Sequence, residues 1–193
     1  MYKRGEYDLA GTIVGVVDRA KMIDGSRIAP GDVVLGLRSN GLHTNGYSLA
    51  RKVLFEKMRF KPASRVPGIP KPIGEELLRV HRNYQPLLAS IPEGLVKGLA
   101  HITGGGLVDN LPRVLPKNCD AAIDTRRWTV PSLFRLIQEG GKVDAAEMYQ
   151  VFNMGIGMAI ITSAGDAAAV VRRTRAICIG VIESGTGKVR LSF

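Results

Sequence analysis

The sequence lacks the long apolar segments that mark membrane and secreted proteins. None of its apolar runs approaches the roughly 20 residues that a membrane-spanning helix needs, and its start, MYKRGEYDLAG, has no apolar signal-peptide core. Cysteine is scarce, because Cys119 and Cys178 are the only two and both lie in apolar, strand-like runs. These absences predict a cytoplasmic protein in which both cysteines are reduced core residues.

Acidic residues are also few. The chain has 17 Asp and Glu against 27 Lys and Arg, a net charge of +10, and such an excess favours an anionic partner. The basic residues are scattered, without zinc-finger spacings, RNP-type aromatic pairs or a long basic arm. We therefore expect a phosphorylated small molecule rather than nucleic acid or a membrane, with a merely solvated basic surface as the alternative for any single cluster.

Several catalytic and nucleotide-binding motifs are missing. The sequence contains no P-loop, no GxGxxG fingerprint and no GxSxG elbow, and Ser48 and Thr103 lack a convincing catalytic triad. His43, His81 and His101, taken with the two cysteines, do not have the spacing of a metal site. The spacing therefore predicts no metal ligands.

The chain is long enough and apolar enough to form one domain with one hydrophobic core, since 45% of its 193 residues are hydrophobic. Alternating strand and helix patterns predict an α+β fold, a mixed β-sheet covered by helices. Strands are expected within residues 7–20, 33–37, 96–102, 119–125, 177–184 and 187–193, with an apolar run at 154–163. Helices are expected from near Thr44 or Asn45, at about 75–88, briefly within 104–115, and at 132–140 and 166–176. The Pro-rich connection that begins at residue 59 is the candidate for a substrate-covering segment.

Three glycine-rich loops, residues 39–48, 101–110 and 152–158, are the candidates for a site. Glycines expose backbone N–H groups, and a helix that follows adds partial positive charge, which suits a phosphate. Each loop alone is more typical of a turn. Together they carry two histidines and three asparagines, a set that can hydrogen-bond a polar substrate: His43, His101, Asn45, Asn110 and Asn153.

Individual polar residues suggest different roles. His43 is the candidate for proton transfer or oxyanion stabilisation. His101 lies at a strand end, whereas His81 is expected on the surface of a helix. Asp109 and Arg113, four residues apart, predict a helical ion pair, with a phosphate as the alternative partner of Arg113.

Four stretches of the sequence carry a family resemblance. GEYDLAGTIVGVV, IDGSRIAPGDVVLGLRSNGLHTNGYSLARKVL, HITGGGLVDNLPRVLP and EMYQVFNMGIGMAI resemble, in order and spacing, the C-terminal half of the phosphoribosylformylglycinamidine cyclo-ligases, also called aminoimidazole ribonucleotide synthetases. The resemblance covers nearly the whole chain. DNLPRVLP and EMYQVFNMGIGM distinguish the cyclo-ligases from relatives with looser versions of the glycine-rich loops.

The resemblance implies a step of purine biosynthesis: ATP-dependent ring closure of formylglycinamidine ribonucleotide to aminoimidazole ribonucleotide, ADP and phosphate. A formamide oxygen is a poor leaving group, so phosphoryl transfer to it would give an iminophosphate that the ring-forming nitrogen displaces. Such a reaction depends on positioning and charge stabilisation more than on a protein nucleophile.

The resemblance also implies a missing half. Residues 1–193 correspond to a single C-terminal-type domain, with residues 1–6 as a remnant of an interdomain segment. The N-terminal domain, joined in cis or supplied in trans, would hold ATP and Mg²⁺ and form most of the homodimer of the full-length enzyme. The chain alone is expected to be inactive. The alternative is a non-catalytic module that binds a phosphoribosyl ligand and has lost the ATP half.

The residues expected to face the substrate or its phosphate come from the three loops, with His43 as the candidate catalytic residue. The others are Thr44, Asn45, Ser48, His101, Thr103, Gly104, Gly105, Gly106, Asn110, Arg113, Asn153, Gly155 and Gly157.

Overall fold

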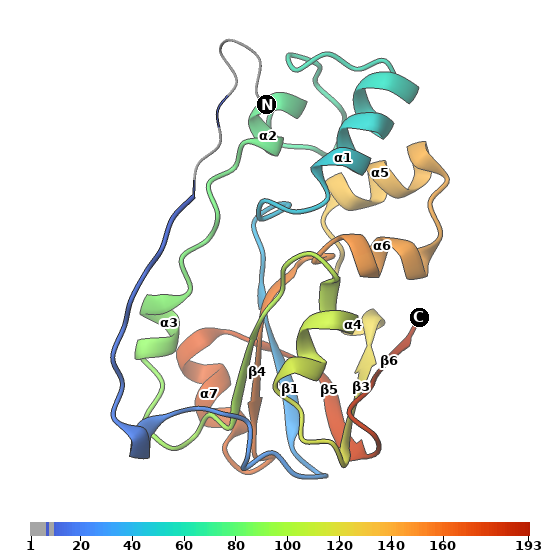
Figure 1. Ribbon diagram of the computed structural model, residues 1–193. Coiled ribbons are helices and arrows are strands. Elements are labelled where there is room, and N and C mark those ends of the chain that lie inside the picture. Colours follow the sequence, from blue (N-terminus) through green and yellow to red (C-terminus); the bar gives the residue numbers. More distant parts are fainter. Residues whose placement is uncertain (1–6, 8–9) are drawn as a thin grey trace.

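Six strands form one mixed sheet in the order β2-β4-β1-β5-β3-β6 (Figure 1). The computed structural model describes residue 7 and residues 10–193, so the predicted interdomain remnant at 1–6 lies outside the described residues. Adjacent strands are antiparallel except β3 and β6, which are parallel. The strands are β1 (Val33–Arg38), β2 (Gly98–His101), β3 (Cys119–Asp124), β4 (Ile156–Thr162), β5 (Ile177–Ser184) and β6 (Val189–Ser192).

In the part of the chain that the structure describes, seven short α-helices cover the sheet, which confirms the predicted fold class (Figure 1). Within the described residues, none of them is long and apolar enough to cross a bilayer. Helix α1 continues into a π-helix at Lys52–Lys57. The α-helices are α1 (Tyr47–Arg51), α2 (Ile73–Leu77), α3 (Gln85–Ala89), α4 (Gly106–Asn110), α5 (Ser132–Gly141), α6 (Ala145–Val151) and α7 (Ala167–Thr174).

The sheet has an apolar core on each face. Successive residues of a strand point to opposite faces, and accordingly Val34 packs in one core while Leu35 and Leu37 pack in the other. The larger core includes Phe134 of α5 and lies under α1, α2, α4, α5 and α6. The smaller core includes Val170 of α7 and lies under α3 and α7. The two cores fix the ends of β1, β2 and β4, from which the glycine-rich loops leave the sheet.

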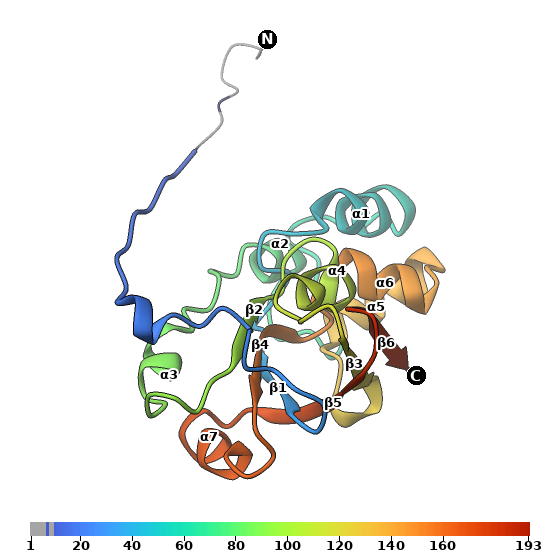
Figure 2. The ribbon, with the colours of Figure 1, turned by 60° about the horizontal axis from the view of Figure 1, so that its bottom comes forward.

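The predicted strand at 7–20 is wrong over its described part. Residues 10–18 form no regular element, and a short 3₁₀ turn follows at Arg19–Lys21. This stretch runs away from the body of the protein (Figure 2). Ile13, Val14 and Val16 are 87–100% exposed. The stretch has the β-branched composition of a strand, but a strand needs a hydrogen-bonded neighbour, and the described residues provide none there.

The continuous helix predicted at about 75–88 is also wrong, because the structure has two short helices with an irregular segment, residues 78–84, between them. Pro86 explains the break, since proline is tolerated in the first turn of a helix but not in its interior. The irregular segment is also bonded to the loop after β1. The Asn40 side chain donates to the Val80 carbonyl at 2.9 Å, and the Tyr84 hydroxyl donates to the Arg38 carbonyl at 3.0 Å.

Two smaller expectations need correction. Helix α1 begins at Tyr47 rather than at Thr44 or Asn45, because Thr44 and Gly46 have left-handed backbones, with φ of 69° and 76°. Both cysteines are free thiols, as predicted, and Cys119 is buried, but Cys178 is exposed. The apolar run of β5 is buried on one face only, through Ile179 and Ile182.

Candidate functional site

The structure brings the three predicted loops together at one end of the sheet. The Ser39 backbone donates to the Gly155 carbonyl at 2.8 Å, and the Ile102 backbone donates to the Gly157 carbonyl at 2.9 Å. The first and second loops also touch, since a Cβ added to Gly104 would lie 3.2 Å from Oδ1 of Asn45. One region of the surface therefore gathers most of the predicted site residues.

Asn153 ties the first loop to the third. Its amide donates to the carbonyls of Gly41 and Leu42 at 2.9 and 3.3 Å, and its oxygen accepts from the Ser39 hydroxyl at 2.8 Å and the Gly155 backbone at 2.9 Å. The side chain is buried. These bonds give Asn153 a structural role in holding the site, and its predicted contact with a ligand stays a prediction.

We expect Asn153→Ala to lower the free energy of unfolding by about 2–4 kcal/mol, because it leaves several buried backbone and hydroxyl groups without partners. Urea unfolding followed by circular dichroism measures the change. Asn45→Ala is the matched control, since Asn45 is only half-buried and makes a single bond, from its amide to the His43 carbonyl at 2.9 Å. Equal losses in the two variants would contradict the role given to Asn153.

Asn110 has the same function in the glycine run. Its amide donates to the carbonyls of Gly106 and Gly104 at 2.7 and 3.2 Å, and its oxygen accepts from the Thr103 hydroxyl at 3.1 Å. Because Asn110 is buried, these bonds are shielded from water. The side chain therefore fixes the turn between β2 and α4.

The glycines of the site are not equivalent. Gly106 has φ of 58°, and a Cβ there would lie 1.8 Å from the Tyr149 carbonyl oxygen. A Cβ on Gly155 would lie 2.7 Å from Pro131, and one on Gly157 would lie 2.1 Å from the Tyr84 hydroxyl. Close packing therefore explains why glycine stands at these three positions. Gly104, by contrast, is exposed, so its backbone is accessible to a ligand at the site.

His43 is held in a strained turn and its ring is fixed by Asn40. The residue is 3% exposed, and its φ of 54° is left-handed, which is uncommon for a residue with a side chain. Nε2 lies 2.5 Å from Oδ1 of Asn40 and 3.2 Å from the Asn40 backbone N–H. The bond of the Asn40 amide to Val80 directs Oδ1 at the ring. The Asn40 backbone N–H can donate to Nε2 only when this nitrogen is unprotonated, whereas the contact of 2.5 Å with Oδ1 needs a proton on it. We assign the ring proton to Nε2 on the shorter contact, which gives up the longer bond from the backbone N–H.

Nδ1 of His43 is consequently a lone pair. It is buried, and among the described residues none forms a hydrogen bond with it. Burial is the largest cause that lowers the pKa of His43 to about 4, followed by the charges of His81, His101 and Arg82. The imidazole is therefore neutral at pH 7 and offers an acceptor at Nδ1.

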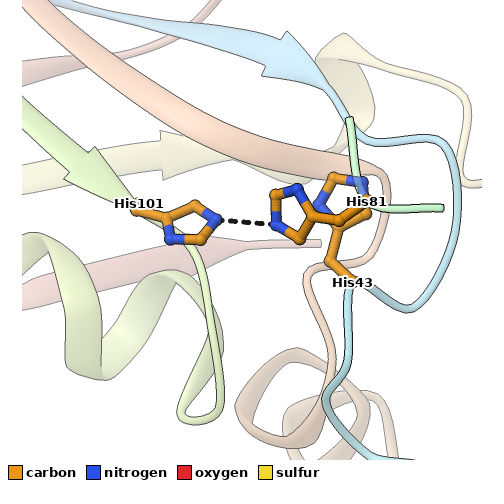
Figure 3. A group of neighbouring side chains, drawn as sticks. All are labelled: His43, His81 and His101. Carbon is orange, nitrogen blue, oxygen red and sulfur yellow. Dashed lines mark hydrogen bonds between the residues drawn. The ribbon is translucent and has the colours of Figure 1, made fainter. Parts of the chain in front are cut away.

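His81 and His101 complete a cluster with His43 (Figure 3). The His81 ring stacks on that of His43, with ring centroids 3.9 Å apart, and Nε2 of His81 lies 3.0 Å from Nε2 of His101. The predicted place of His81 on a helix surface is wrong, because it lies in the irregular segment between α2 and α3. The feature of the sequence that indicates a position outside a helix for His81 is Pro86, which separates α2 from α3.

A cavity of about 700 Å³ adjoins the cluster. Its lining combines the two outer histidines with a cationic and several apolar side chains: His81, Arg82, Tyr84, Leu88, His101 and Met158. The Arg82 guanidinium donates to the Arg38 carbonyl at 3.0 Å, and Arg79 lies 3.4 Å from the Asn40 carbonyl. Arg79 is paired with Glu76 at 3.0 Å, so Arg82 is the cationic side chain of this cavity lining, and it favours an anionic ligand there.

The remaining predicted site residues are placed less centrally. Thr44 and Ser48 are exposed on the first loop and on α1. Arg113 is exposed in the 3₁₀ turn Leu111–Arg113, beyond the end of α4. The predicted ion pair of Arg113 with Asp109 is not among those of the described residues. The helix ends at Asn110, so the two residues lack the spacing of one helical face.

Comparison with known proteins identifies the family. The family model described as "AIR synthase related protein, C-terminal domain" matches residues 29–191. The chain belongs to this family. A phosphoribosylformylglycinamidine cyclo-ligase of Syntrophus aciditrophicus is 46% identical over 200 residues, covering 100% of this chain and 58% of the relative. The chain therefore spans a little more than half the length of this curated relative.

Solved structures confirm the AIR synthase-like fold. A thiamine-monophosphate kinase from Stenotrophomonas maltophilia has a TM-score of 0.57 at 15% identity and covers 91% of this chain and 54% of its own. The hydrogenase maturation protein HypE in complex with ATP has a TM-score of 0.53 at 17% identity, covering 86% of this chain and 49% of its own. At these identities the likeness concerns the fold alone.

Proposed function

We propose that this chain is the substrate-side half of an ATP-dependent cyclo-ligase of purine biosynthesis, a cytoplasmic enzyme that converts formylglycinamidine ribonucleotide to aminoimidazole ribonucleotide, ADP and phosphate. The observation that carries the proposal is the match along the whole chain to a curated cyclo-ligase, at 46% identity. The gathering of the three glycine-rich loops around His43 supports it, since all three loops lie within the stretches that carry the family resemblance.

In this proposal the ribonucleotide lies against the loops and the adjoining cavity. The exposed backbone at Gly104 and the side chains of Thr44 and Ser48 are available to a polar ligand, while Arg82 favours its phosphate. Asn153, Asn110 and the packed glycines hold the loops in position. Such positioning is the main contribution a protein makes to this kind of phosphoryl transfer and displacement.

His43 has the role of proton acceptor. Its Nδ1 lone pair is available to the nitrogen that closes the imidazole ring and must lose a proton. A neutral imidazole with a lone pair on Nδ1 can accept a proton. Stabilising an oxyanion would instead need an N–H donor at Nδ1, so we assign His43 to proton acceptance. Because His81 stacks on the ring and Nδ1 is buried, access of the substrate requires that His81 move aside.

ATP and Mg²⁺ are assigned mainly to the N-terminal half of the full-length enzyme. HypE, of the same fold, binds ATP in its solved complex. Within the described residues, the one cluster of three or more candidate metal ligands consists of imidazoles, whereas Mg²⁺ prefers oxygen ligands. These residues do not fit Mg²⁺, so no step that this chain performs is assigned to that ion.

The partner of this chain is then an N-terminal domain, joined in cis or supplied in trans. The relative's greater length leaves room for such a domain. The exposed apolar residues Ile13, Val14 and Val16 give it a surface to cover. We assign the homodimer of the full-length enzyme mainly to that N-terminal domain.

Complementation in trans tests the proposal. The chain is mixed with the N-terminal half of the Syntrophus aciditrophicus relative, and ring closure is assayed with formylglycinamidine ribonucleotide, ATP and Mg²⁺. Each half alone is the negative control and the full-length relative is the positive control. We expect activity only in the mixture. Complex formation without turnover, while the full-length control works, would contradict the enzymatic function and favour a module that only binds the ribonucleotide.

A further inference from the structure

We propose that His43, His81 and His101 form a binding site for a divalent transition-metal ion of the Zn²⁺ class, with one imidazole nitrogen from each residue as ligand (Figure 3). One ring nitrogen of each histidine lies within 4.8 Å of the others. Imidazole is a preferred ligand of Zn²⁺, Ni²⁺ and Cu²⁺. The site goes beyond ring closure, and a metal ion bound there would occupy the Nδ1 lone pair that His43 uses in ring closure, so the metal-bound chain is expected not to support that step.

The hydrogen bonds around two of the rings have the pattern of metal-binding histidines. Such a histidine binds the metal through one ring nitrogen and donates the proton of the other to an oxygen. Nε2–H of His43 donates to Oδ1 of Asn40, and Nδ1–H of His81 donates to the Arg82 carbonyl at 2.8 Å. These bonds leave the lone pairs on Nδ1 of His43 and Nε2 of His81.

His43 supplies an independent observation. Its side chain is more than nine-tenths buried, yet Nδ1 has no hydrogen-bond partner among the described residues. Leaving a buried polar atom unpaired is destabilising. A metal ion bound at Nδ1 would give this atom a partner.

The spacing of the other two rings is close to that of a metal site. Nε2 of His101 donates a hydrogen bond to Nε2 of His81 at 3.0 Å, and binding of the metal replaces this bond, with the His101 proton moved to Nδ1. Two nitrogens each about 2.0–2.1 Å from a tetrahedral Zn²⁺ lie roughly 3.3 Å apart. Binding requires the stacked rings of His43 and His81 to separate. His81 can make this movement because it lies in the irregular segment between α2 and α3.

The cavity of about 700 Å³ beside His81 and His101 leaves room for a fourth ligand. Three protein ligands with one open position are typical of an accessible zinc site. Arg82, which lines the same cavity, repels a bare cation. We therefore place an anion, such as chloride or phosphate, in the fourth position, where it offsets this repulsion.

The test uses the untagged chain, treated with a chelator and then titrated with Co²⁺, whose visible absorption bands report its ligands. We expect saturation at one Co²⁺ per chain, followed by loss of the bands when Zn²⁺ is added. His81→Ala and His101→Ala should each weaken binding at least tenfold. Asn40→Ala, which removes the partner of His43, should weaken it about tenfold.

The matched control is Cys178→Ser, because the exposed Cys178 thiol is the alternative metal ligand of the described surface. It should bind Co²⁺ as the unchanged chain does. His81→Ala changes a half-exposed residue of an irregular segment, and thermal unfolding checks that it remains folded. The proposal is overturned if Co²⁺ gives no stoichiometric bands, if His81→Ala binds with unchanged affinity, or if Cys178→Ser abolishes binding.

Discussion

Gly106→Ala is expected to lower the free energy of unfolding by roughly 3 kcal/mol or more, through both backbone strain and overpacking. The added Cβ would lie 1.8 Å from the Tyr149 carbonyl oxygen and 3.1 Å from that of Phe152. Both contacts are with backbone, so neither can be relieved by a side-chain rotation. The left-handed φ of 58° adds strain for any residue other than glycine. Urea unfolding of the purified chain measures the loss.

The same glycine run provides the control for this prediction. Gly104 does not have a left-handed φ, and its added Cβ would meet only the Asn45 side chain, at 3.2 Å. Gly104→Ala should therefore change the free energy of unfolding by no more than about 0.5 kcal/mol. A Gly106→Ala variant as stable as Gly104→Ala would refute the packing explanation of Gly106. The comparison distinguishes Gly106, which the fold requires, from Gly104, whose backbone is exposed at the site.

His43→Asn is expected to lower kcat of the complemented enzyme about 100-fold, because it removes the proton acceptor of ring closure. Asparagine tolerates the left-handed backbone of this position, so it tests the chemistry with little disturbance of the turn. KM for the ribonucleotide should change little if His43 acts mainly on the proton that leaves. Steady-state kinetics of the complemented mixture provide both constants.

Cys178→Ser serves as the control for this variant as well, since Cys178 lies on β5 and contributes to none of the three loops. Its kcat and KM should match those of the unchanged chain. Thermal unfolding of His43→Asn separates lost catalysis from lost folding. A folded His43→Asn variant with normal kcat would remove His43 from the mechanism, and an increase in KM alone would make it a binding residue.

Much of the fold could be predicted because the pattern of the sequence is local and consistent. Strands β1, β3 and β5 and helices α5 and α7 follow from apolar runs and helical spacing. The failures have tertiary causes. Residues 10–18 have the composition of a strand, yet this chain gives them no neighbour to pair with. The segment 78–84 leaves the helical path because Pro86 restarts the helix and Asn40 and Tyr84 bind it to the first loop.

The candidate site was only partly predictable for the same reason. Glycine, asparagine and histidine mark the three loops, and these loops do meet in the structure. The distance between His81 and His43 along the chain gave no sign that their rings stack. Spacing rules find metal sites whose ligands share one element, whereas these histidines come from three separate segments. Nor does the sequence show that the side chains of Asn153 and Asn110 form their hydrogen bonds within the protein itself.

Amide hydrogen exchange of the complemented chain, with and without formylglycinamidine ribonucleotide, tests most directly whether the three loops face the ribonucleotide. We expect added protection in residues 39–48 and 101–106 and in the segment 78–84, with little change along β3, β5 and β6. Protection confined to the β3–β5 side, with none in the loops, would contradict it.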